Sequence, residues 1–243
     1  EIAQCLVGSE MCIRDRGKAV SKETKVDILV TPLVTIFAGV GLSMLIAAPI
    51  GAAASQVGTL IMWATEQAPL VMGVLVSVIV GVALTLPISS AAICAALGLT
   101  GLAGGAAVAG CCAQMVGFAV MSFKENRYGG LVAQGLGTSM LQMGNIVKNP
   151  RIWLPPTIVS AITGPIASCV FKMENGVGVA SGMGTCGLVG PIGVMASDGF
   201  GSAKSWIGML LVCFILPAVL TPLVAYPMRK LGWIKDGDLK LEL

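Results

Sequence analysis

The chain has 243 residues and a formal net charge of +3, with 56% hydrophobic residues, only 11% charged residues and a mean hydropathy of +0.90. An average soluble domain has about 25% charged residues, so this composition excludes a water-soluble surface and predicts an integral membrane protein. The sequence also lacks histidine and any G-x-x-x-x-G-K-[ST] nucleotide loop. We therefore expect no catalytic residue, no phosphorylation site, no metal and no cofactor in this chain, and no nucleic-acid partner.

The first sixteen residues, Glu1–Arg16, do not fit the pattern that follows them. They lack the apolar core of a signal peptide and resemble translated sequencing-adapter sequence. We interpret residues 1–16 as a foreign head. Residues 17–243 are then a single transmembrane domain whose natural N-terminus is missing.

The first half of the chain predicts two spans and a helix rich in small residues. Ile28–Ile50 has 23 uncharged residues, which is enough for one crossing. Between Gln67 and Phe123 there are 57 residues without a charge, about 85 Å of helix, so this run crosses more than once. We predict a span at Pro69–Leu86, a turn at Pro87–Ser90 and a segment of Ala, Gly and Cys at Ala91–Met121. In that segment small residues recur at steps of four and predict a close helix contact: Gly101, Gly105, Ala109, Ala113 and Gly117.

The second half alternates polar loops with apolar segments. Lys124–Arg127 and Lys148–Pro156 are predicted loops, and Gly129–Val147 is either a span that faces the protein interior or a re-entrant element. Further apolar segments lie at Thr157–Phe171, Val177–Ser197 and Trp206–Tyr226. Basic residues before the first span and after the last place both termini in the cytoplasm by the positive-inside rule. The fold prediction is an all-α polytopic membrane protein with about six transmembrane helices plus Gly-rich re-entrant or broken-helix segments.

Two similar glycine-containing strings are candidates for a central site. Gly135–Thr138 and Gly182–Thr185 share the pattern GxGT, 47 residues apart, and each lies near a charged loop that contains Asn. Irregular backbone at membrane depth survives only inside protein or beside a cavity, and paired interrupted segments often mark a transporter's substrate site. Chance recurrence in a chain with 32 glycines is the alternative.

Polar side chains near these strings are the candidate substrate contacts. Uncharged amides at membrane depth must find partners, and they suit a neutral polyol better than an ion. The carboxylate Glu174 would accept hydrogen bonds from sugar hydroxyls, although a solvated loop charge is the alternative for it and for its neighbours. The predicted substrate-binding set is Gln134, Thr138, Gln142, Asn145, Asn149, Arg151, Glu174 and Asn175.

Several strings resemble one known family. They are SKETKVDILVTP at Ser21–Pro32, LTLPISSAAI at Leu84–Ile93, GCCAQMVGFAVMSFKEN at Gly110–Asn126, QGLGTSMLQ at Gln134–Gln142, NIVKNPRIWLPP at Asn145–Pro156 and KMENGVGVASGMGTCGLVGPIG at Lys172–Gly193. In this order they resemble the PTS EIIC-like membrane family, which includes proteins labelled perfringolysin O regulator-like or toxin regulators. The resemblance runs from about Gly17 to Leu243.

The resemblance implies a sugar permease subunit, EIIC, of the phosphoenolpyruvate-dependent phosphotransferase system in a bacterial plasma membrane. Such a subunit binds and translocates sugar, while a cytoplasmic EIIB, charged through EIIA and HPr, donates the phosphoryl group. The chain would then be part of a protein-N(pi)-phosphohistidine-sugar phosphotransferase system, and we expect a homodimer. Two alternatives stay open: a membrane regulator or sensor without transport, and an ion-coupled or passive transporter.

Overall fold

The structure, a computed structural model, describes residues 61, 63, 66–199, 203–235 and 237–241. All of them belong to one compact unit, Val57–Leu243. The predicted foreign head at 1–16 and the predicted span Ile28–Ile50 lie outside the described residues, as do the basic residues that precede that span. The secondary structure of the described residues is helical, with one isolated antiparallel bridge between Gly101 and Asn175.

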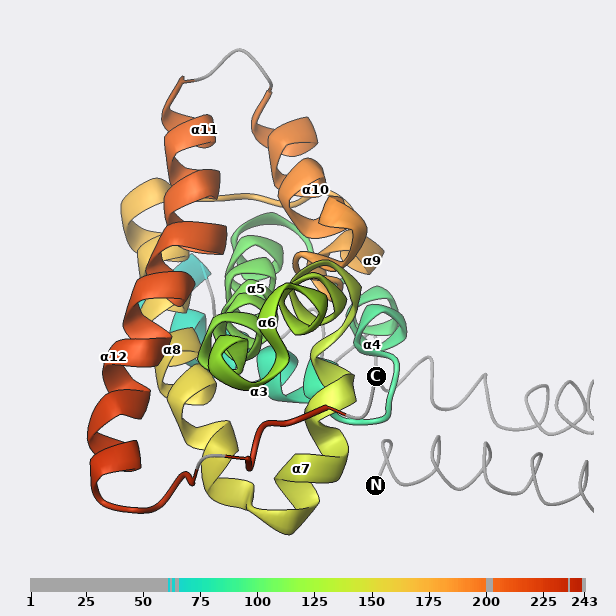
Figure 1. Cartoon of the computed structure of the whole chain (residues 1–243). Helices are drawn as coiled ribbons and strands as arrows, with labels where there is room; N and C mark the ends of the chain where they lie inside the picture. The colour runs from blue at the N-terminus through green and yellow to red at the C-terminus, as the bar shows by residue number, and fades with distance from the viewer. Residues whose placement is uncertain (1–60, 62, 64–65, 200–202, 236, 242–243) are drawn as a thin grey trace, which may run out of the picture. The chain divides into compact units, whose positions relative to one another are not determined.

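Helix α5, Gly101–Met121, forms the centre of this unit. It is buried along almost its whole length, and helices α3 (Pro69–Thr85), α8 (Leu154–Pro165) and α12 (Leu216–Lys230) pack around it (Figure 1). Because so many of its residues are Gly, Ala or Cys, neighbouring backbones approach α5 from several sides.

The glycines of α5 contact different partners, which corrects the prediction of a single stripe. A Cβ at Gly105 would overlap the backbone carbonyl of Met173, and a Cβ at Gly117 would lie 2.8 Å from the hydroxyl of Thr221 in α12. Gly101 has open space around it. The closest approach of α3 is to Gly110, outside the predicted stripe, where a Cβ would overlap the carbonyl of Ser77.

Helix α3 matches the predicted second span closely and packs tightly on α8. Pro69 occupies its first turn, where a missing N–H costs nothing. The Ser77 hydroxyl donates to the carbonyl of Ser160 in α8 at 2.8 Å, and a Cβ at Gly164 would overlap Ser77. The predicted turn follows: the hydroxyl of Ser89 caps helix α4, Ser90–Leu97, by accepting from the N–H of Ala92 at 3.2 Å. Gly98, at a φ of 61°, then separates α4 from α5, so 91–121 is two helices.

The region after α5 differs from the prediction at 124–127, where a loop was expected and the chain is helical. At 129–147, where one continuous span was one of two options, the helix is interrupted. Residues 124–127 lie in α6, Phe123–Val132, which kinks at Arg127 (φ 51°). The next residues form a π-helical turn η1 (Ala133–Gly137), a 3₁₀ turn η2 (Ser139–Gln142) and the short helix α7 (Met143–Lys148). This succession fits the re-entrant alternative for 129–147 rather than one continuous span.

The predicted loop at 148–156 is also largely helical. A 3₁₀ turn η3, Pro150–Trp153, leads directly into α8, and a π-helical turn η4, Ile166–Phe171, extends it. Pro155 and Pro156 are accommodated because they lie in the first turn of α8. The span therefore begins earlier than the predicted Thr157.

The last part contains a second broken region and the longest apolar helix. Residues 177–197 divide into α9 (Gly178–Ser181), a 3₁₀ turn η5 (Cys186–Leu188) and α10 (Val189–Asp198). Helix α11 (Ala203–Leu210), the π-helical turn η6 (Leu211–Ile215) and α12 run on continuously and contain the predicted span 206–226.

Among the described residues, three helical stretches are long and apolar enough to cross a membrane: Gly101–Met121, Pro150–Phe171 and Ala203–Lys230. Pro69–Thr85 and Cys186–Ser197 are shorter apolar helices. The unit is thus all-α with membrane-spanning helices, and the total of six crossings stays a prediction.

Candidate functional site

The two GxGT strings meet, although they are 47 residues apart in the sequence. The buried hydroxyl of Thr185 donates to the carbonyl of Gly135 at 2.6 Å. Each string lies where regular α-helix stops: the first spans η1 and the start of η2, and the second lies between α9 and η5. The predicted pairing of two interrupted segments is therefore present in the fold.

This meeting point, which we call the paired breaks (Gly135–Ser139 with Gly182–Thr185), lies against α5 from its middle, at Cys111, toward Ala119 near its end. A Cβ at Gly184 would lie 2.7 Å from the Cβ of Cys111, about ten residues or 15 Å from either end of α5. Gly184 has a φ of 55°, which favours glycine, so the chain turns here directly against the central helix. If α5 spans a hydrocarbon core of about 30 Å, the paired breaks begin near its midplane.

A buried polar cluster on α5 adjoins the paired breaks. The hydroxyl of Thr85, at the end of α3, lies 3.2 Å from that of Ser139 and 3.5 Å from the side-chain oxygen of Gln114. The Gln114 amide donates to the hydroxyl of Thr157 in α8 at 3.2 Å. Sequence reasoning missed Gln114 and Thr85. The available signal was one amide in the otherwise apolar and small-residue run 101–121.

Three of the predicted amides form a row that begins beside the end of α5. The amide of Gln134 donates to the hydroxyl of Ser122 at 2.8 Å, and Gln142 donates to the side-chain oxygen of Gln134 at 3.1 Å. Asn145 in turn donates to the side-chain oxygen of Gln142 at 2.8 Å. We call Gln134, Gln142 and Asn145 the amide row. Gln134 and Gln142 are fully buried, so the expectation that these amides find internal partners is met.

Asn149 and Arg151 contact the C-terminal segment, of which the structure describes residues 231–235 and 237–241. The Asn149 amide donates to the carbonyl of Trp233 at 3.0 Å and to the carboxylate of Asp238 at 2.8 Å. The guanidinium of Arg151 lies over the ring of Trp233, 5.4 Å from its centroid. A solvent-open cavity of about 280 Å³ lies beside these contacts, lined by Asn145, Lys148, Asn149, Gly237, Asp238 and Lys240.

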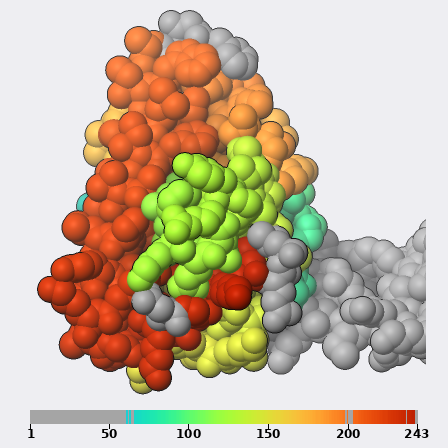
Figure 2. All heavy atoms as spheres, in the orientation of Figure 1, coloured from blue at the N-terminus to red at the C-terminus, as the bar shows by residue number. Residues whose placement is uncertain are grey.

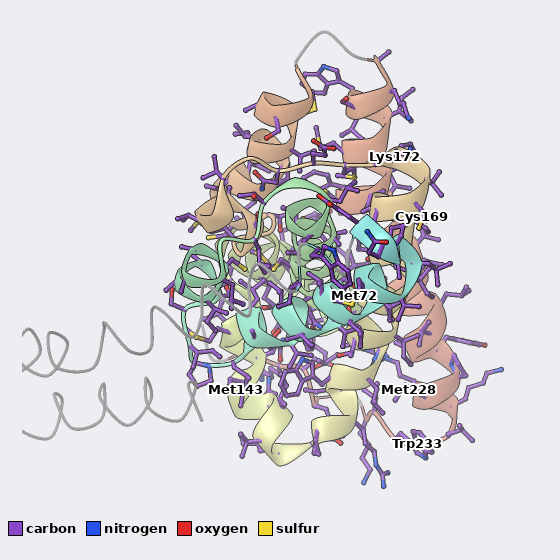
Figure 3. All side chains as sticks on the ribbon, turned by 180° about the vertical axis from the view of Figure 1, so that it is seen from behind. Met72, Met143, Cys169, Lys172, Met228 and Trp233 are labelled. Carbon is purple, nitrogen blue, oxygen red and sulfur yellow. The ribbon has the colours of Figure 1, made fainter. Side chains whose placement is uncertain are left out.

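Glu174 and Asn175 lie at the opposite end of α5. Asn175 is buried and pairs with Gly101, donating its N–H to the Gly101 carbonyl at 3.1 Å and accepting the Gly101 N–H at 2.9 Å. Glu174 is exposed. Because α5 is 21 residues or about 30 Å long, these two residues cannot share a ligand with the amide row. Figure 3 shows this separation: Lys172 is labelled at one end of the unit, and Met143 and Trp233 near the other.

The eight predicted residues therefore belong to several places. Thr138 lies in the paired breaks, where its hydroxyl accepts the N–H of Met140 at 3.1 Å, and the amide row continues from there toward the C-terminal segment. Asn149 and Arg151 contact other residues of that segment, Trp233 and Asp238. Asn175 supports the start of α5, as its backbone pairing and its side-chain contact with the N–H of Val177 at 3.1 Å indicate.

Charge is distributed unequally between the two ends of α5. At the Met121 end, the guanidinium of Arg229 donates to the Met121 carbonyl at 2.9 Å and lies 3.9 Å from the carboxylate of Glu125. The cations of this end among the described residues are Lys124, Arg127, Lys148, Arg151, Arg229, Lys230, Lys235 and Lys240. At the Gly101 end the described cations are Lys172 and Lys204.

Comparison with known families identifies one match. The model of the family described as "Phosphotransferase system, EIIC" matches residues 12–241, nearly the whole chain. The match includes the last five residues of the segment 1–16, whose interpretation as a foreign head stays a prediction. Comparison with curated proteins and with solved structures gives no match.

Proposed function

The chain belongs to the phosphotransferase system EIIC family, and we propose that it binds a sugar at the paired breaks and translocates it for phosphorylation by a separate EIIB. Family membership makes it a bacterial membrane component of permease type. The location of the sugar site, the donor and the orientation in the membrane are the proposal.

The observation that carries the site is the bond between Thr185 and the Gly135 carbonyl at mid-depth of α5. Two segments depart from regular α-helix there, and because lipid cannot satisfy backbone groups outside regular helix, such segments lie inside protein or beside a cavity. A site near the membrane centre between two interrupted segments is reachable from either side when one segment moves against the other.

The side chains around the paired breaks suit a neutral sugar. Thr85, Gln114, Ser139 and Thr185 are buried, uncharged, and supply both donors and acceptors. A sugar offers matching hydroxyl groups, whereas an ion would favour a carboxylate or a guanidinium at this depth. Of the residues predicted from the sequence, Thr138 lies in the paired breaks and Gln134 adjoins them, and we assign both to the boundary of the sugar site.

The Met121 end of α5 is the cytoplasmic face in this proposal. Eight described cations gather at this end against two at the other, as the positive-inside rule requires of cytoplasmic loops. The phosphorylated donor subunit would dock on this face. Phosphoryl transfer needs mainly positioning and charge stabilisation, so the membrane subunit has to present the sugar hydroxyl and needs no histidine of its own.

The test is transport by the complete system in membrane vesicles, with a panel of radiolabelled hexoses, hexitols and disaccharides. With EIIB, EIIA, HPr and enzyme I supplied, we expect one labelled compound to accumulate as its phosphate only when phosphoenolpyruvate is added. Accumulation of an unmodified sugar under an ion gradient would instead indicate an ion-coupled transporter. Binding without accumulation in any form would favour a sensor.

A further inference from the structure

The C-terminal segment is bound through its backbone by side chains of α6, η2 and α7, and we propose that it is a latch that holds the broken region 133–142 in place. Release of the segment would free the amide row and let the first break move. That the segment holds residues 133–142 in place is independent of the proposed function. Only the effect of its release on transport rests on the proposed function.

Side chains contact the segment at three consecutive residues. The carbonyl of Leu239 accepts from Asn126 at 2.7 Å and from Gln142 at 3.1 Å, and its N–H donates to the carboxylate of Glu125 at 2.8 Å. The Lys240 carbonyl accepts from Asn145 at 3.0 Å, and the N–H of Leu241 donates to the side-chain oxygen of Asn126 at 2.8 Å. Asn126 therefore pairs with the segment as a neighbouring strand would. Figure 2 shows the red C-terminal residues between the green α6 and the yellow-green α7.

Two apolar side chains anchor the same segment. Leu239 is fully buried and Ile234 nearly so, in a cluster with Phe118 and Met121 of α5 and Ile146 of α7. Because burial of apolar side chains is the main favourable term in packing, the fully buried Leu239 is the main anchor and the hydrogen bonds fix the register.

The amide row connects this anchor to the first break. A side-chain amide has two N–H donors, and Gln142 uses one for Gln134 and the other for the Leu239 carbonyl. Asn145 divides its two donors in the same way, between Gln142 and the Lys240 carbonyl. When the segment leaves, the buried amide of Gln142 and the half-buried amide of Asn145 each lose one partner. Because a buried donor without a partner is costly, the row must rearrange, and it includes Gln134 in η1 and Gln142 in η2.

The geometry also explains how the latch opens. The bonds between residues 239–241 and the helices α6, η2 and α7 are to side chains, and Gly237, Asp238 and Lys240 border the solvent-open cavity beside α7. Opening has to expose Leu239 and Ile234, whereas the outer bonds of the segment, to Asn145 and Asn149, already face solvent. The segment lies at the basic end, where a docking donor subunit would contact it first.

Hydrogen exchange of the purified full chain in detergent tests the latch without any sugar. In Leu239→Ser and Asn126→Ala we expect amide exchange to become about tenfold faster in 231–241 and also in 133–142, and to stay unchanged in α5. Ser197→Ala is the control, because its hydroxyl supports Gly176 at the other end of α5 (2.6 Å) and its loss should leave both regions unchanged.

Three results would overturn the latch. Faster exchange in 231–241 with an unchanged rate in 133–142 would show that the amide row does not couple the segment to the first break. No change in 231–241 would show that the contacts do not hold the segment. Faster exchange throughout α5 would make the segment part of the core. If the latch controls transport, both variants also alter phosphoenolpyruvate-dependent sugar phosphate formation, and a change in exchange without a change in transport would leave the latch standing but separate it from the proposed function.

Discussion

Thr185→Val tests the contact that joins the two breaks. Valine has the shape of threonine, so the change removes the hydroxyl that donates to the Gly135 carbonyl at 2.6 Å and little else. A net loss of about 0.5–1.5 kcal/mol is expected for one such bond, and bonds between helices in membranes average about 0.6 kcal/mol. Because 1.4 kcal/mol is a factor of ten, we expect sugar affinity to fall about threefold to tenfold.

The matched control is Thr163→Val. Thr163 is also buried, but its hydroxyl donates to the Ser160 carbonyl within its own helix at 3.3 Å. The assay is sugar binding to the purified protein, with unfolding in detergent measured in parallel. If both variants bound sugar equally well, or if Thr163→Val were the more damaging, the Thr185 contact would have no special role in the site.

Two further changes test the packing. Gly110→Ala should destabilise the protein by about 1–3 kcal/mol, measured as a lower unfolding temperature in detergent, because its Cβ would overlap the backbone of Ser77. Gly144 in α7 has open space around it, so Gly144→Ala should leave the unfolding temperature unchanged or raise it. An equal drop in unfolding temperature in both variants would contradict the described α3–α5 contact. Maleimide labelling of a variant with Cys5 and Cys12 replaced by serine tests the burial of the other thiols. The half-buried Cys169 and Cys186 should react before the buried thiols, which are Cys94, Cys111, Cys112 and Cys213. Rapid labelling of Cys111 would refute the central burial of α5.

Composition and spacing predicted the elements whose causes are local. Pro69–Thr85 and the span around 206–226 follow from uncharged runs of spanning length, and both appear within a few residues of the prediction. The pairing of the two GxGT strings was predictable as well, since glycine at membrane depth requires a protein environment. The two strings do meet, through Thr185, while their role as a substrate site stays a prediction.

Two predicted loops are helical in the structure, because charged residues at 124–127 and prolines at 148–156 were interpreted as marking loops. Residues 124–127 lie in α6, where Glu125 and Asn126 bind the C-terminal segment. The prolines of 148–156 fit the first turns of η3 and α8. At 124–127 a segment distant in the sequence supplies the partners of the polar side chains. At 148–156 the start of a helix accommodates the prolines.

The amides could not be assigned from the sequence. Gln142 and Asn145 were predicted to face a substrate, and in the structure each gives one donor to another amide and one to the backbone of residue 239 or 240, almost a hundred positions away. Conversely, Gln114 was passed over as one amide in an apolar helix. Whether an amide binds backbone or faces a site depends on which segments the fold brings together, and spacing in one segment does not contain that information.

The location of the sugar site is tested most directly by equilibrium binding of the transported sugar, identified in the vesicle panel, to the purified full chain without its phosphotransferase partners. Two variants report on the middle and on the Gly101 end of α5: Gln114→Leu removes the amide beside the paired breaks, and Glu174→Gln neutralises the exposed carboxylate near Gly101. We expect Gln114→Leu to weaken binding at least tenfold and Glu174→Gln to leave it unchanged. Binding that survives Gln114→Leu and is lost in Glu174→Gln would place the sugar at the Gly101 end of α5 and contradict a site at the paired breaks.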